Sequence, residues 1–148
     1  MMAFKNRMKA QTREVSRAQN RKEERVVEGI QPKVSFNFKD FDQNQCPPGQ
    51  TYESWQEDKL LAYMLQKFGY ISQCSVLEAI QKRFIKLYKD FPPRSDFQVP
   101  AYIEGDVNWA VIMDIKGQKA RVAGYIIDSV FYVVFLDKEH LFYKMKDR

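Results

Sequence analysis

The chain has 148 residues, a length that suits one domain with a real core and a tail. Its apolar fraction of 45% and charged fraction of 29% are those of a globular protein, which excludes a membrane-embedded chain. No stretch approaches the roughly 20 apolar residues that cross a membrane, and the polar N-terminus excludes a signal-peptide core. We therefore expect a soluble, cytoplasmic protein without a membrane partner.

The net charge of +5 is concentrated at the N-terminus. Met1 to Lys33 contains nine basic and four acidic residues, whereas the remaining residues contain fifteen of each. Apolar residues in the first segment are too sparse for a packed helix, so we predict a basic, flexible arm over residues 1–31 and a folded domain over residues 32–148. Such an arm suits RNA or another acidic surface, or ordering on a partner; a solvated tail is the alternative.

The folded part begins with a strand and a helix. Apolar residues alternate with polar ones over Val34–Phe41, which predicts a half-buried strand. A loop follows over Asp42–Gln50. Thr51 is a suitable N-cap for a helix with one apolar face that continues to about Lys67, and Gly69 is expected to close it.

A second helix is predicted to begin near Ser72 or Ser75. Ser75 and Glu78 have the spacing of a capping box, and apolar residues follow at three- and four-residue spacing as far as Phe91. The helix should stop there, because the prolines that come next at 92 and 93 cannot continue it.

Three strands follow a polar connector over residues 94–106. They are Trp109–Lys116, Lys119–Ile127 and Val130–Asp137, joined by two-residue turns. The last of them has apolar side chains on both faces as far as Leu136, so it should be a central strand of the sheet. This order of one strand, two helices and three strands predicts an α+β fold, in which a two-helix hairpin covers one face of an antiparallel sheet of about four strands.

The second of these strands and the segment after the third carry side chains suited to phosphate chemistry. Arg121 is the best candidate for a phosphate clamp, because its planar guanidinium stays charged. His140, the only histidine, has an unperturbed pKa of about 6.5 and suits a general acid or base. Tyr143 can donate a proton, orient a phosphate or stack on a base; Glu139 is a spare base. Lysines suited to flanking phosphates are Lys116, Lys119, Lys138 and Lys144.

Each of these assignments has an alternative. Arg121 can pair with Asp114 or Asp128 across the hairpin, His140 can be a surface turn residue, and Tyr143 can pack the end of the sheet. The lysines can simply be solvated.

The two cysteines, Cys46 and Cys74, are expected to be free thiols. Neither cysteine has a histidine nearby at the spacing of metal ligands, so no metal site is predicted.

The order of elements and the C-terminal sequence resemble the RelE/ParE-like superfamily of bacterial toxins. Lys119–Tyr125 is similar to the arginine-containing strand of that family, and Phe131–Leu136 to its central strand. His140 and Tyr143 lie where the family has its terminal functional residues. The likeness covers roughly Val34 to Tyr143.

The resemblance implies the toxin of a type II toxin–antitoxin pair. Endoribonuclease members cut messenger RNA, typically within the ribosome, need no metal or cofactor, and are silenced by an antitoxin protein. A base activates the ribose 2′-OH for attack on the adjacent phosphorus, and an acid protonates the leaving oxygen. Two alternatives are a non-enzymatic ParE-like inhibitor of DNA gyrase and an interaction domain with a vestigial site. A neutral folded domain, with Asp137 and Glu139 near the site, favours the last.

Overall fold

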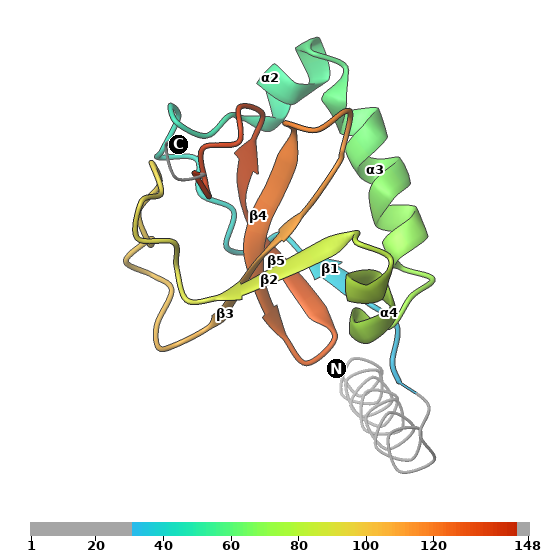
Figure 1. Cartoon of the computed structure of the whole chain (residues 1–148). Helices are drawn as coiled ribbons and strands as arrows, with labels where there is room; N and C mark the ends of the chain where they lie inside the picture. The colour runs from blue at the N-terminus through green and yellow to red at the C-terminus, as the bar shows by residue number, and fades with distance from the viewer. Residues whose placement is uncertain (1–30, 145–148) are drawn as a thin grey trace, which may run out of the picture. The chain divides into compact units, whose positions relative to one another are not determined.

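The computed structural model describes residues 31–144, which form an α+β domain around a five-stranded mixed sheet (Figure 1). This confirms the predicted α+β class. The arm predicted over residues 1–31 lies outside the described residues, except for Gln31. The elements in chain order are β1 (Ser35–Asn37), α2 (Tyr52–Glu57), α3 (Leu60–Ile71), α4 (Val76–Gln81), β2 (Ile85–Lys89), β3 (Asn108–Ile112), β4 (Arg121–Ile127) and β5 (Val130–Asp137).

The sheet has the strand order β1-β5-β4-β3-β2. β5 lies between β1 and β4, so the prediction of a central strand over these residues is confirmed, with the same bounds. The prediction of an antiparallel sheet of about four strands is wrong on two counts. β1 pairs in parallel with β5, with Ser35 opposite Val130, and β2 adds a fifth strand at the far edge.

The first predicted helix is two helices in the structure. Thr51 caps α2 as predicted, because its side-chain oxygen accepts a hydrogen bond from the Ser54 N–H at 3.1 Å. The backbone of Lys59 is left-handed (φ +60°), which ends the first helical segment before α3 begins. Gly69 does not close the helix, since α3 continues through it to Ile71.

The second predicted helix is correct at its start and wrong at its end. Ser75 and Glu78 form the predicted capping box, but α4 stops at Gln81. Arg83 takes a left-handed backbone (φ +62°) and donates to the Ile80 carbonyl, while the Phe84 N–H donates to Ala79. These two bonds are those of a Schellman motif, which normally has glycine at the left-handed position. The residues that follow pair with β3 as strand β2.

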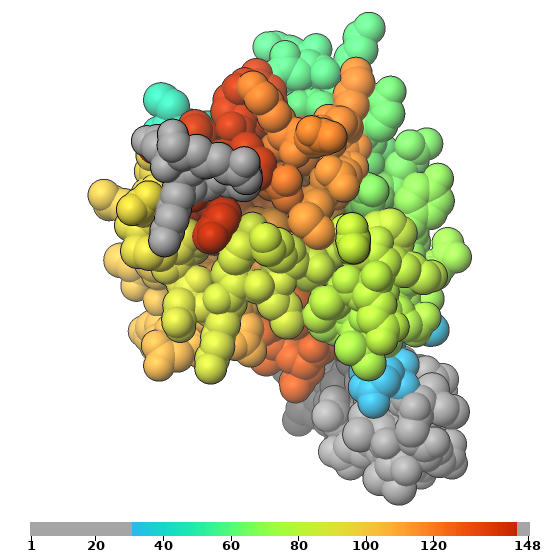
Figure 2. All heavy atoms as spheres, viewed as in Figure 1, coloured from blue at the N-terminus to red at the C-terminus, as the bar shows by residue number. Residues whose placement is uncertain are grey.

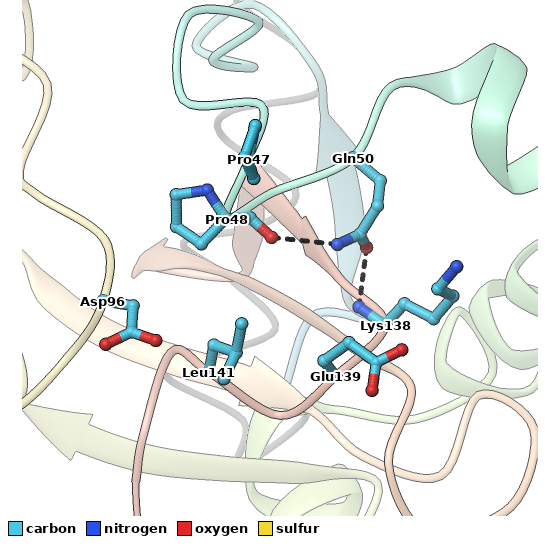
Figure 3. A pocket seen from close by; sticks show the side chains of 7 residues that line it. All are labelled: Pro47, Pro48, Gln50, Asp96, Lys138, Glu139 and Leu141. Atoms are coloured by element: carbon cyan, nitrogen blue, oxygen red, sulfur yellow. Dashed lines mark hydrogen bonds between the residues drawn. The ribbon is translucent and has the colours of Figure 1, made fainter.

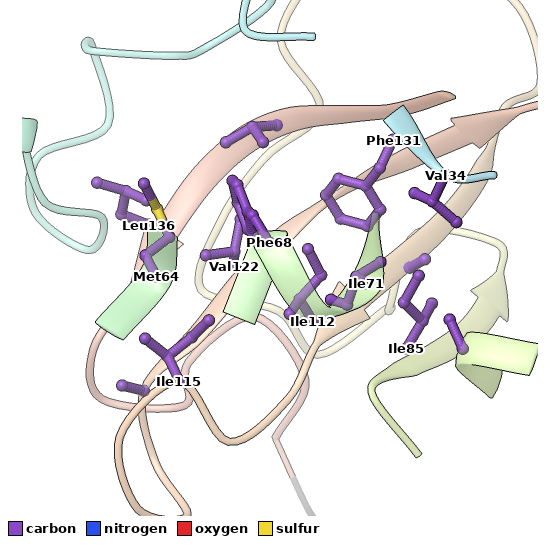
Figure 4. Packing of buried hydrophobic residues seen from close by; sticks show 14 of the residues in the cluster. Val34, Met64, Phe68, Ile71, Ile85, Ile112, Ile115, Val122, Phe131 and Leu136 are labelled. Carbon is purple, nitrogen blue, oxygen red and sulfur yellow. The ribbon is translucent and has the colours of Figure 1, made fainter. Parts of the chain in front are cut away.

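Both faces of the sheet are covered. α2, α3 and α4 pack on one face, and Figure 4 shows labelled side chains of α3, β2, β3, β4 and β5 meeting there. The opposite face is covered by the connector between β2 and β3 and by the segment after β5, which contributes the fully buried Phe142. The labelled residues of the helix-side core in Figure 4 are Val34, Met64, Phe68, Ile71, Ile85, Ile112, Ile115, Val122, Phe131 and Leu136.

A bulge interrupts the pairing of the two longest strands at Gly124. The register shifts between Ala123 and Gly124, and a Cβ on Gly124 would lie 1.9 Å from the Tyr132 carbonyl oxygen. The absence of a side chain is therefore what lets the two strands approach here.

Among the helices of residues 31–144, none is both long and apolar enough to cross a membrane.

Candidate functional site

The segment after β5 is held by one buried carboxylate. Asp137, the last residue of β5, is fully buried and accepts hydrogen bonds from the Leu141 N–H at 2.9 Å and the Phe142 N–H at 2.8 Å. Burial raises the pKa of Asp137, and these two hydrogen bonds and the charges of His140 and Arg121 oppose that rise. Asp137 thus fixes the turn that carries His140 and leads to Tyr143.

Arg121 opens β4, directly across from Asp137 in the pairing with β5. It is half-buried and lies on the side of the sheet away from the helices, near Tyr88. Its Nη2 donates to the Gln118 carbonyl oxygen at 3.3 Å, and its buried Nε has no partner. No carboxylate of residues 31–144 lies within 4.0 Å of the guanidinium, so the alternative of an ion pair with Asp114 or Asp128 is not seen.

Tyr143 stacks on an aromatic residue that sequence analysis did not single out. Its ring centroid lies 4.6 Å from that of Tyr88 on β2, with 10° between the ring planes. The Lys86 ammonium lies 5.4 Å from the Tyr88 centroid and 5.6 Å from the Tyr143 centroid. Figure 2 shows red atoms of the C-terminal segment against the yellow-green atoms of β2. Tyr143 is 38% exposed, so its packing leaves a substantial surface open to a ligand.

Electrostatic effects connect Arg121 to the same cluster. Burial raises the pKa of Tyr88, the charge of Arg121 opposes the rise, and Tyr143 and Asp137 add to it. Arg121, Tyr88, Lys86 and Tyr143 therefore form one group, which we call the Arg121–Tyr143 cluster. It combines two cations with two stacked phenols.

His140 lies in the turn between Asp137 and the cluster. Its backbone is left-handed (φ +62°), a conformation that costs energy in a non-glycine residue. The side chain is half-buried, and its charge reaches the Asp137 carboxylate. The structure therefore places the three predicted catalytic residues around Asp137 and Tyr88, with His140 on the turn and Arg121 and Tyr143 in the cluster.

Three of the four lysines predicted to bind RNA are engaged in ion pairs. Lys119 pairs with Glu139 at 3.9 Å, Lys138 with Asp58 at 2.8 Å and Lys144 with Asp96 at 2.6 Å. Lys116 has no ion pair with any residue from 31 to 144, and its ammonium lies 4.9 Å from the ring centroid of Tyr63.

Sequence analysis missed Lys86 and Tyr88 because both fell within the predicted second helix. Their spacing from earlier apolar residues fits a helix, yet Ile85-Lys86-Leu87 also alternates as a strand does. The short length of the run made the two patterns indistinguishable. A glycine at position 83, where the left-handed backbone ends the helix, would have indicated that the following residues form a strand, but this position is an arginine.

A shallow, open hollow of about 600 Å³ lies beside the same turn (Figure 3). Its lining includes Gln50, whose side-chain oxygen accepts from the Lys138 N–H at 2.7 Å, and neither Arg121, His140 nor Tyr143 takes part. The two carboxylates that line it, Asp96 and Glu139, are those already paired with lysines.

Cys46 and Cys74 are free thiols, as predicted. Within the described part of the chain, no three His, Cys, Asp or Glu side chains gather as a metal site.

Comparisons of the chain with models of protein families, with curated proteins and with solved structures found no match.

Proposed function

We propose that this domain is a metal-independent endoribonuclease that cleaves messenger RNA, and that it is the toxin of a toxin–antitoxin pair. The observation that carries the proposal is the Arg121–Tyr143 cluster. An arginine that forms no ion pair with any residue from 31 to 144 stands beside two stacked tyrosines and a lysine, near the turn that carries the only histidine of the chain. The assignment to a toxin–antitoxin pair rests on the resemblance of the sequence to RelE-like proteins.

The groups suit cleavage at a ribose phosphate. The guanidinium of Arg121 and the ammonium of Lys86 would bind the non-bridging phosphoryl oxygens, where negative charge accumulates in the transition state. Tyr143 has an exposed ring on which a base can stack and a hydroxyl that can orient the phosphate. His140 has the side chain best suited to proton transfer near neutral pH.

The reaction proposed is an intramolecular transesterification. The ribose 2′-oxygen forms a bond to the adjacent phosphorus as a base takes its proton, and the bond from phosphorus to the 5′-oxygen breaks as an acid protonates that oxygen. The products are a 2′,3′-cyclic phosphate and a 5′-hydroxyl end. Because the substrate supplies the nucleophile, the protein has to position the phosphate, move protons and stabilise charge.

The test is incubation of the purified protein with a labelled RNA in EDTA, alone and with ribosomes carrying the same message. We expect new ends with a 2′,3′-cyclic phosphate, and a block when the scissile ribose is 2′-deoxy. Arg121→Ala and His140→Ala should each lower the rate by at least about 100-fold. Glu104→Ala, an exposed residue of the connector, is the matched control. Cleavage that persists in both site variants would refute the assignment.

One observation favours a second function, in which the protein acts by binding without cleavage. Lys119, Lys138 and Lys144 are paired with carboxylates, so they offer less free positive charge to RNA than unpaired lysines would. A ParE-like inhibitor or an interaction domain would use the same surface for a protein. Growth arrest on induced expression, without new messenger RNA ends, would favour this reading over the first.

A further inference from the structure

The unpaired basic side chains of the domain are not scattered evenly. Among residues 31–144, five lysines form ion pairs: Lys33, Lys39, Lys119, Lys138 and Lys144. Nine other basic residues of that range make no ion pair: Lys59, Arg94 and Arg121 are three of them, and the other six lie on α3, after α4, on β2 and in the turn between β3 and β4. These six are Lys67, Lys82, Arg83, Lys86, Lys89 and Lys116.

The segments that carry these residues adjoin on one side of the molecule. In Figure 2 the green atoms of α3, the yellow-green atoms of α4 and β2, and the orange atoms of the β3–β4 turn meet on the face in view. The exposed carboxylates within or directly beside these segments and outside the ion pairs are Asp90 and Asp114. The domain is neutral as a whole, yet this face carries a clear excess of positive charge.

Aromatic rings are interleaved with the cations on this face. The Lys116 ammonium lies 4.9 Å from the Tyr63 ring centroid, and the Lys67 ammonium lies 5.1 Å from that of Phe84. The Met113 N–H donates to the Phe84 carbonyl at 3.0 Å, which holds Phe84 beside the turn that carries Lys116. We call Tyr63, Lys67, Phe84 and Lys116 the basic–aromatic strip.

The strip borders the Arg121–Tyr143 cluster along the chain, with the two on opposite sides of the edge strand β2. Phe84 is followed directly by β2, which carries Lys86 and Tyr88. At the other end, the β3–β4 turn runs from Lys116 to Arg121, whose guanidinium donates to the Gln118 carbonyl of that turn. Two routes along the chain therefore connect the strip to the cluster.

We propose that the basic–aromatic strip binds single-stranded RNA and leads it to the Arg121–Tyr143 cluster, an inference that rests on the proposed function for its catalytic end. Alternating lysines and aromatic rings match the alternation of phosphates and bases along an unpaired strand. A base that stacks on Tyr63 or Phe84 displaces the lysine that covers the ring, and the ammonium then meets a neighbouring phosphate. A duplex offers phosphates but no free base faces, so it gains only part of this energy.

Fluorescence anisotropy with 2′-O-methyl RNA tests the strip separately from cleavage, because these oligonucleotides lack the attacking hydroxyl. We expect an oligomer of about 12 nucleotides to bind at least about tenfold more tightly than one of about four. The double variant Lys67→Ala/Lys116→Ala should lower the affinity for the longer oligomer roughly tenfold and reduce the salt slope by about 1.4, since each single-strand phosphate contact contributes about 0.7. The short oligomer should be affected less than twofold.

The control variant is Lys33→Ala/Lys39→Ala, in which both lysines have carboxylate partners. It should bind the longer oligomer within twofold of wild type. An unchanged affinity in the strip variant, equal binding of duplex and single strand, or no binding by wild type would each overturn the inference. Circular dichroism must show that both variants are folded.

Cleavage of the corresponding ribo-oligomer separates the two proposals. Strip-dependent binding without cleavage would refute the proposed enzyme and leave the RNA-binding strip standing. Cleavage with strip-independent binding would support the enzyme and overturn the strip.

Discussion

Replacement of Asp137 by alanine should destabilise the domain by roughly 2–4 kcal/mol. The fully buried carboxylate satisfies two backbone N–H groups, those of Leu141 and Phe142, at 2.9 and 2.8 Å. A buried donor left without a partner costs about 1–3 kcal/mol, so two would cost up to about 6. The variant also removes a carboxylate whose pKa burial raises, and the relief of that desolvation brings the estimate down.

The assay is urea unfolding followed by far-UV circular dichroism at pH 7, read as the free energy of unfolding. Asp137→Asn retains one acceptor and loses the buried charge, so it should cost about half as much as alanine. Glu104→Ala, which changes an exposed side chain, should stay within about 0.5 kcal/mol of wild type. An alanine variant within about 0.5 kcal/mol of wild type would show that Asp137 does not hold the terminal segment.

The same residue predicts a dependence of stability on pH. Because its pKa is raised on folding, the folded protein holds the Asp137 proton more tightly than the unfolded chain. Its contribution to stability is therefore fully present below the unfolded pKa and is lost as the pH rises through the folded pKa. Asp137→Asn should remove that part of the slope in the free energy of unfolding against pH.

Three further predictions concern backbone conformation and the stability of the protein at alkaline pH. Gly124→Ala should cost at least ~3 kcal/mol in urea unfolding, because its Cβ would meet the Tyr132 carbonyl, whereas Gly69→Ala, with open space in α3, should gain about 0.5–1 kcal/mol. Arg83→Gly should raise the free energy of unfolding by roughly 0.5 kcal/mol, since relief of the left-handed backbone outweighs the added chain entropy; a loss would contradict this. Burial raises the pKa of Tyr102 to about 12, so stability should fall as the pH rises from about 10 to about 12, and a slope unchanged by Tyr102→Phe would contradict the assignment.

Local signals in the sequence located much of the fold. Val130–Asp137 is a strand with the predicted bounds, because its apolar run on both faces is typical of a strand inside a sheet. The capping box of Ser75 and Glu78 marked the start of α4 correctly, because its two partners are only three residues apart in the sequence.

The predictions that were wrong concern features set by the backbone conformation of one residue or by pairing between residues far apart in the chain. The end of α4 rests on a left-handed Arg83, and an arginine gives no sign of that conformation in a sequence. The parallel pairing of β1 with β5 joins segments from opposite ends of the domain, which periodicity cannot report. Both strands were predicted from their own patterns, but their pairing was not.

In the candidate site, too, local patterns located single residues but not the contacts between residues far apart in the chain. The pattern of β4 located Arg121, but its neighbours Lys86 and Tyr88 became visible only once β2 was recognised as a strand. The ion pairs of Lys138 with Asp58 and of Lys144 with Asp96 connect residues far apart in the chain. A lysine that is free and one that is paired look identical in a sequence.

The position of β5 has a consequence for the order in which the protein is made. This last strand of the domain lies in the middle of the sheet, between β1 and β4, and Asp137 at its end fixes the turn of His140. While a ribosome still holds β5, β1 has no strand to pair with, and the two halves of the sheet remain separate. A nascent chain therefore cannot complete the Arg121–Tyr143 cluster until synthesis has passed Tyr143.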